Sequence, residues 1–93
     1  MITSSMLRQL EEDLYNILDY ELPPYHQISE VSAKYVGGGV VNLLFIINHS
    51  GYGEPDRGEC ERTIKQYNYN VCTQNPYRGE IAVTNSTVKF YKK

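Results

Sequence analysis

The side chains best suited to chemistry are two histidines and two cysteines, His26, His49, Cys60 and Cys72. A cysteine activated by a histidine is a nucleophile, and two residues of each kind could hold a tetrahedral zinc ion. None of the four lies in a local catalytic signature, and no two have the close spacing of zinc ligands. We therefore expect no enzyme, no metal site and no cofactor, and we interpret both histidines as surface loop residues.

The two cysteines are twelve positions apart. In one straight strand they would lie roughly 40 Å apart, which is beyond the reach of a disulfide. Two cysteines also lack the dense framework of a small secreted scaffold. Two separate thiols, buried or half-buried, are therefore favoured over a disulfide, which would require the chain to bend back between Cys60 and Cys72.

Length and charge limit the classes of partner. The 93 residues form a single domain, 1–93, with a formal net charge of -2 and 22% charged residues. Nucleic acids and anionic membranes need clustered excess lysine and arginine, which this composition does not supply. The longest apolar run, Val40 to Ile47, is too short to cross a bilayer. We therefore expect a protein partner, with no nucleic acid and no membrane.

The location of the protein in or outside the cell stays open. The N-terminus has no basic segment followed by an apolar one, as an uncleaved secretory signal would have. Two segments, Asn48-His49-Ser50 and Asn85-Ser86-Thr87, fit the pattern for N-glycosylation. The pattern slightly favours a secreted over a cytoplasmic protein.

The N-terminal segment predicts an amphipathic helix over about Ser5 to Tyr20, with Ser4 or Ser5 as its N-cap. It should end before Pro23, because the residue before a proline avoids the helical region. We expect one face to pack on a sheet. The apolar residues that recur at steps of three and four are Met6, Leu7, Leu10, Leu14, Ile17 and Leu18, of which Leu10, Leu14 and Ile17 are expected to be buried.

From Tyr25 onward the apolar pattern has a period of two, which predicts strands. A first strand with a bulge near Ser29 leads to the glycines at 37–39, where the chain can reverse into a hairpin. The second strand follows, with Val41, Leu43, Phe45 and Ile47 on the face toward the helix. A third strand is predicted over Cys60 to Thr73, then a turn at Asn75 to Gly79 and a last strand from Glu80 to Tyr91.

The predicted fold class is α+β, with one amphipathic helix packed across a four-stranded antiparallel meander sheet. This order of elements resembles the cystatin superfamily, which includes cystatins, stefins, the cathelin domain and monellin-like proteins. The hairpin at Lys34 to Gly38, the turn at Pro76-Tyr77 and the segment Glu61 to Tyr69 carry the resemblance.

The resemblance implies an inhibitor that wedges hairpin tips into the cleft of a papain-like cysteine protease. The protease-binding residues that it implies are Lys34, Tyr35, Val36, Gly37, Gly38, Pro76 and Tyr77. The chain departs from the family pattern, because Lys34 stands where Gln is usual, Tyr77 stands where Trp is usual, and the N-terminal glycine is missing. A buried lysine at the tip would have to be desolvated, which weakens the expected inhibition.

Two other functions remain open beside the inhibitor. The chain could be a non-inhibitory binding module on the same scaffold for a protein or small molecule, or a small viral or phage inhibitor of a host protein. The glycines and the Pro-Tyr turn could also do no more than close hairpins. Because the hairpin at 31–47 is apolar on both faces, we also expect a homodimer, with exchange of that hairpin as one route.

Overall fold

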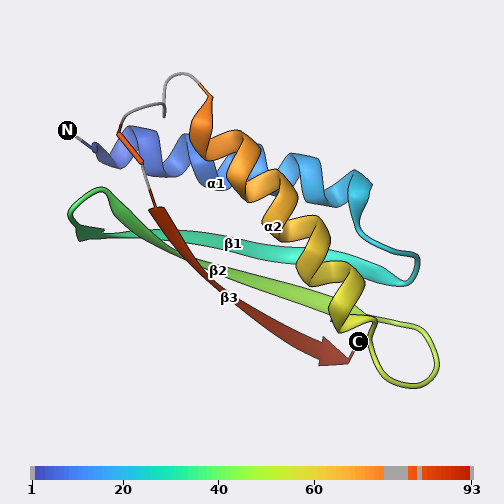
Figure 1. The fold of residues 1–93 in the computed structure, drawn as a ribbon. Helices are drawn as coiled ribbons and strands as arrows, with labels where there is room; N and C mark the ends of the chain where they lie inside the picture. The colour runs from blue at the N-terminus through green and yellow to red at the C-terminus, as the bar shows by residue number, and fades with distance from the viewer. Residues whose placement is uncertain (1, 75–79, 82, 93) are drawn as a thin grey trace.

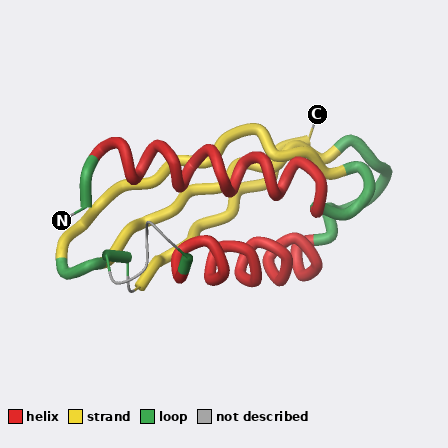
Figure 2. The backbone as a smooth tube through the Cα atoms, turned by 90° about the horizontal axis from the view of Figure 1, so that it is seen from above, coloured by secondary structure: helices red, strands yellow, loops and turns green. Residues whose placement is uncertain are grey.

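The computed structural model describes residues 2–74, 80, 81 and 83–92, and these form a helical layer on one side of a sheet (Figure 1). The strands lie in the order β1-β2-β3. Figure 2 looks onto the helical layer and shows the two helices beside each other. The elements in chain order are α1 (Ser4–Glu21), β1 (His26–Gly37), β2 (Val40–His49), α2 (Arg57–Thr73) and β3 (Val83–Lys92).

Helix α1 confirms the predicted N-terminal helix and extends it by one residue at each end. Its N-cap is Thr3, not Ser4 or Ser5, and the Thr3 hydroxyl accepts a hydrogen bond from the Met6 N–H at 3.2 Å. The helix buries Leu10 and Leu14 completely, as expected, whereas Leu18 takes the fully buried place predicted for Ile17.

The β1–β2 hairpin also agrees with the sequence. The two strands pair antiparallel, and the register shifts between Ile28 and Glu30, which confirms the bulge predicted near Ser29. Gly37, Gly38 and Gly39 all have positive φ, a region that suits glycine at a tight reversal. The inner face of β2 is the predicted one and is fully buried: Val41, Leu43, Phe45 and Ile47.

The prediction of a strand over Cys60 to Thr73 is wrong, because this segment is helix α2. The Asp56 carboxylate caps the helix by accepting from the Glu59 N–H at 3.2 Å. The buried positions then follow at four-residue steps, which is the spacing of one helix face. The apparent alternation of tyrosines that suggested a strand lies partly on the exposed side, where Tyr69 is 70% exposed.

The four-stranded antiparallel meander is therefore also wrong. Because α2 carries the chain back along the sheet, β3 starts beside the start of β2 and runs parallel to it, from Val40↔Val83 to His49↔Lys92. The described residues form one mixed sheet of three strands with two helices, still of the α+β class. The predicted turn at 75–79 lies outside the described residues. Neither helix of the described chain is long and apolar enough to span a membrane.

The core lies between the helices and the inner face of the sheet. Each of the five elements contributes apolar side chains to it or packs against it, so no element is an independent appendage. The buried apolar residues are Leu10, Leu14, Leu18, Ile28, Val31, Val41, Leu43, Phe45, Ile47, Cys60, Ile64, Val71, Cys72 and Ile81.

The central place of Leu14 in this core predicts a large effect of its truncation. Leu14→Ala should lower the free energy of unfolding by about 2 to 5 kcal/mol, because it leaves a cavity where α1 meets the sheet. Tyr20→Ala on the same helix removes a side chain that is 87% exposed and should cost less than about 0.5 kcal/mol. Urea denaturation of both variants measures the difference, and equal costs would contradict the packing of α1.

Candidate functional site

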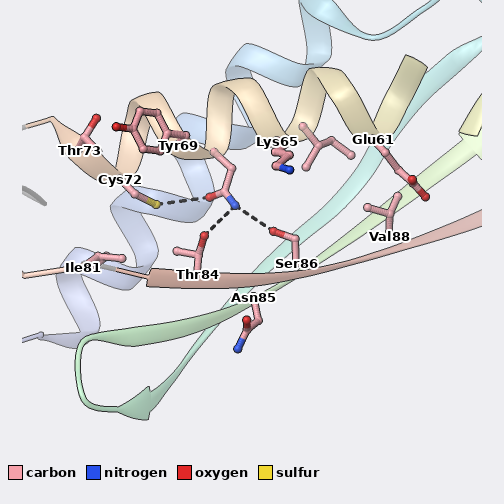
Figure 3. A pocket seen from close by; sticks show the side chains of 12 residues that line it. Glu61, Lys65, Tyr69, Cys72, Thr73, Ile81, Thr84, Asn85, Ser86 and Val88 are labelled. Carbon is pink, nitrogen blue, oxygen red and sulfur yellow. Dashed lines mark hydrogen bonds between the residues drawn. The ribbon is translucent and has the colours of Figure 1, made fainter. Parts of the chain in front are cut away.

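A groove of about 640 Å³ lies between α2 and the outer strand β3 (Figure 3). Its floor is apolar where Ile64, Ile81 and Val88 contribute, and Ile64 and Ile81 are almost completely buried. Polar side chains from both elements interrupt this floor. The groove therefore has the mixed lining of a binding site: apolar area with a small number of placed polar groups.

The polar centre of the groove is Asn68, which is only 5% exposed. Its side-chain amide donates to the hydroxyl oxygens of Thr84 and Ser86, both at 2.9 Å. Its carbonyl oxygen accepts from the Cys72 thiol at 3.4 Å. The dashed lines in Figure 3 trace these three bonds from α2 to β3. The network satisfies the buried amide and fixes the side of α2 that faces β3.

The two hydroxyls of this network have unused hydrogen-bonding capacity. A hydroxyl has one donor proton and can accept two hydrogen bonds. Thr84 and Ser86 each accept from Asn68, and neither donates to another side chain or carbonyl in the described part of the chain. Ser86 is exposed and Thr84 half-buried. The groove therefore presents two O–H donors, two residues apart on one strand face, to an incoming acceptor.

Charged and aromatic side chains from α2 form the rim of the groove. Glu61 and Lys65 are one helical turn apart and exposed, and Tyr69 follows one turn later. Figure 3 shows these side chains along the edge of α2 that faces the groove. A ligand would thus meet an ammonium, a carboxylate and an aromatic ring before it reached the hydroxyls.

The two thiols are buried and free, which confirms the expectation of separate thiols. Burial raises the pKa of Cys72 from 9.0 to about 11. Burial also raises the pKa of Cys60 to about 11, with further contributions from the carboxylates of Asp56, Glu59 and Glu61. Both thiols are therefore protonated at neutral pH and are poor nucleophiles. Among the described residues, no three His, Cys, Asp or Glu side chains form a group that could hold a metal ion.

The hairpin residues predicted to bind a protease lie at the β1–β2 tip. Lys34, Tyr35, Val36 and Gly38 are exposed there, and Gly37 is half-buried. The Tyr35 hydroxyl accepts from the Gly39 N–H at 3.3 Å and so closes the tip. An added Cβ at Gly38 would meet no neighbour, so only its φ of +61° restricts substitution. The other two predicted residues, Pro76 and Tyr77, lie outside the described residues.

The two histidines are paired at the other end of the hairpin, which differs from their interpretation as surface loop residues. Their ring centroids are 4.9 Å apart, and His49 is buried. Nε2 of His26 accepts from the Asp56 N–H at 3.0 Å, so the proton is on Nδ1, which donates to the Pro24 carbonyl at 2.8 Å. The pair anchors the loop that leads into α2, and neither thiol is hydrogen-bonded to an imidazole within the described chain.

Sequence reasoning missed Asn68, Thr84 and Ser86. The detectable signal was the helix start, since an Asp followed three residues later by a Glu is typical of a capped N-terminus, as at Asp56 and Glu59. With α2 recognised, the four-residue spacing of Cys60, Ile64 and Asn68 would have placed an amide in the middle of an apolar stripe.

The network predicts that substitution of two asparagines of α2 by alanine has unequal effects on stability. Asn68→Ala should lower the free energy of unfolding by about 1 to 3 kcal/mol, because the thiol and both hydroxyls lose their shared partner. Asn70→Ala, at an exposed position two residues later, should cost less than about 0.5 kcal/mol. Thermal and urea denaturation of the two variants check this, and a neutral Asn68→Ala would show that the network carries no stability.

The raised thiol pKa values predict a loss of stability at alkaline pH. The pKa of each thiol is higher in the folded than in the unfolded chain. The contribution of each thiol to the free energy of unfolding is therefore complete below about pH 9 and is lost as pH rises through about 11. The fall in the free energy of unfolding over this window should be smaller in Cys72→Ala than in the unmodified chain. At pH 8, iodoacetamide should label neither cysteine until the protein is unfolded, and fast labelling of the native protein would contradict their burial.

Comparison of the chain with family models, with curated proteins and with solved structures gave no match.

Proposed function

We propose that the protein is a non-catalytic binding module whose α2–β3 groove receives a hydrogen-bond-accepting side chain of a protein partner. The observation that carries this proposal is the pair of hydroxyls of Thr84 and Ser86, which Asn68 holds by their oxygens. Because both oxygens accept from the amide, their O–H protons are free to donate to a ligand in the groove. A carboxylate or carboxamide oxygen is the natural complement to two convergent donors.

The dimensions and lining of the groove support a ligand of side-chain size or larger. Its volume of about 640 Å³ lies within the range of ligand pockets, about 300 to 1,000 Å³. The apolar floor offers area to the carbon atoms of a ligand, while the hydroxyls orient its polar end. Lys65 at the rim adds long-range attraction for a carboxylate, although Glu61 one turn away opposes it.

The preorganised hydroxyls matter because they need no reorganisation on binding. Thr84 lies in a strand and Ser86 two residues further along it, and both oxygens are already fixed by one buried amide. Binding therefore costs little side-chain entropy at these positions, which favours affinity for a given contact area. The protonated state of both thiols is consistent with a binding role without covalent chemistry.

A panel of blocked single amino acids tests this function. In ¹⁵N-resolved NMR titrations, N-acetyl amides of Asp, Asn, Glu and Gln should shift the signals of Asn68, Thr84 and Ser86, whereas those of Leu and Lys should not. Ser86→Ala should weaken the interaction by about three- to tenfold, the loss of one hydrogen bond of about 0.5 to 1.5 kcal/mol.

A matched pair of threonines supplies the control. Thr84→Val removes a groove hydroxyl, whereas Thr87→Val makes the same change on the opposite face of β3. Only the first should reduce the shifts. Equal effects of both variants, or shifts caused by Leu and Lys derivatives, would contradict a site built on the groove hydroxyls.

Inhibition of a papain-like cysteine protease is the second candidate, and the exposed glycine tip of the β1–β2 hairpin favours it. The tip residues Lys34, Tyr35 and Val36 are exposed at the end of β1, which pairs with β2 along its length. Such a tip can enter a cleft without unfolding. The tip would act alone or with residues outside the described chain.

A titration of papain tests this candidate with two substitutions. Lys34→Gln should tighten inhibition, because it removes a charge that would be desolvated in the cleft. Gly38→Val should weaken it by at least about tenfold, since a β-branched residue is strained at a φ of +61°. The absence of inhibition at micromolar protein would exclude the candidate.

A further inference from the structure

The two outer strands of the sheet differ in how their free edges are protected. On β1 the outward Ala33 N–H donates to the Glu11 carboxylate of α1 at 2.7 Å. The bulge between Ile28 and Glu30 also breaks the regular spacing that another strand would need. Helix α1 packs directly on this strand. These features are the usual ways in which a protein prevents strand addition at an edge.

Within the described chain, strand β3 lacks both a bulge and a side chain bonded to its outer backbone, and α2 contacts it through side chains. It pairs with β2 in an unbroken one-to-one register over its ten residues, with no bulge and no proline. Apart from the ladder with β2, the hydrogen bonds between β3 and other described elements involve side chains of β3: Thr84 and Ser86 accept from Asn68, and Asn85 donates to Asn42. Within the described residues, the backbone groups on its outer edge therefore have no partner and could pair with a further strand.

The available edge borders the α2–β3 groove. Thr84, Ser86 and Val88 of β3 line the groove, and alternate residues of any strand added beside β3 would point to the same side of the sheet. An added strand would lie about 4.8 Å from β3 and place every second side chain in the groove, facing α2. The edge would supply affinity through the backbone, and the groove would supply side-chain specificity.

Charge decides between a second copy of this chain and another partner. β3 carries Lys89 and Lys92 and no acidic residue, although the whole chain has a net charge of -2. Both lysines are exposed, and Lys65 and Glu61 at the groove rim offset each other. Parallel pairing of two copies of β3 would bring four lysines together at one end of the interface, whereas an acidic strand would neutralise the lysines. The charges favour an acidic partner.

We propose that an extended, acidic segment of a partner protein binds as a fourth strand along the outer edge of β3, with alternate side chains in the α2–β3 groove. This inference rests on the proposed function, because the same groove and hydroxyls receive the side chains. It adds the conformation of the partner segment, its charge and its position on the sheet.

The probe is a capped peptide of about seven residues in which valine alternates with aspartate, long enough to pair with most of β3 at about 3.3 Å per residue. Two N-methylated forms separate backbone pairing from charge attraction, one methylated at the valines and one at the aspartates. The backbone N–H groups of alternate residues in a strand point toward the same neighbouring strand. The form whose methyl groups point away from β3 should therefore bind with an affinity within about threefold of that of the parent peptide. The other should lose at least about tenfold.

Charge reversal on the protein gives the matched variants. Lys89→Glu combined with Lys92→Glu should lower the affinity for the aspartate peptide by more than about tenfold. The same change should raise the affinity for a peptide in which lysine replaces aspartate. Lys34→Glu, on the exposed hairpin tip, is the control and should change either affinity by less than about threefold. Amide hydrogen exchange should show new protection confined to β3 and the groove face of α2.

The outcomes distinguish the inference from the function on which it rests. If blocked amino acids shift the groove signals but both N-methylated peptides bind equally, the strand proposal fails and the proposed function stands. If neither amino acids nor peptides affect the groove, both fail. If sedimentation shows a dimer of this chain in which β3 amides are protected, a second copy occupies the edge and the proposal is overturned.

Discussion

The burial of one face of β2 is the constraint on which the other elements depend. Val41, Leu43, Phe45 and Ile47 lose nearly all contact with water, at roughly 1.5 to 3 kcal/mol each. β2 is the central strand, and in the described chain both helices lie on the side of the sheet that carries this buried face (Figure 1). Helix α1 packs on β1, while α2, which carries the chain back across the sheet, is hydrogen-bonded to β3 through Asn68. The groove arises where α2 leaves β3 incompletely covered.

Asn68 shows how a polar residue can hold this incomplete covering in place. An apolar side chain at its position would extend the stripe of Cys60 and Ile64 but could not form hydrogen bonds to β3. The amide instead connects one thiol on α2 to two hydroxyls on β3. Its burial is tolerated because each of its hydrogen-bonding groups has a partner. The same bonds that position the helix leave the hydroxyl protons for a ligand, so structure and binding chemistry share one residue.

The sequence predicted an element correctly where its apolar residues followed a single spacing, either that of a helix or that of a strand. The three-and-four spacing around Leu10 and Leu14 predicted α1, and the alternation from Val41 to Ile47 predicted the buried face of β2. It failed between Cys60 and Thr73, because the polar Asn68 interrupts the helical stripe and the tyrosines beside it imitate a strand. That single error changed the direction of β3 and hence the sheet topology. The candidate site was missed for the same reason, because its central residue, Asn68, interrupts the helical pattern, although the cap at Asp56 and Glu59 marked the start of the helix.

The unequal edges of the sheet follow from the same arrangement. α1 enters the fold before β1 and lies against it, so a carboxylate on α1 can reach the outward N–H of Ala33. α2 is a crossover between β2 and β3, and within the described chain its hydrogen bonds reach β3 through side chains on the groove face. A ten-residue strand edge that no other described element covers would ordinarily promote aggregation, and exposed lysines such as Lys89 and Lys92 oppose it by charge repulsion between copies. The same lysines leave the edge open to a strand of opposite charge, so protection from self-association and selection of an acidic partner require the same two side chains.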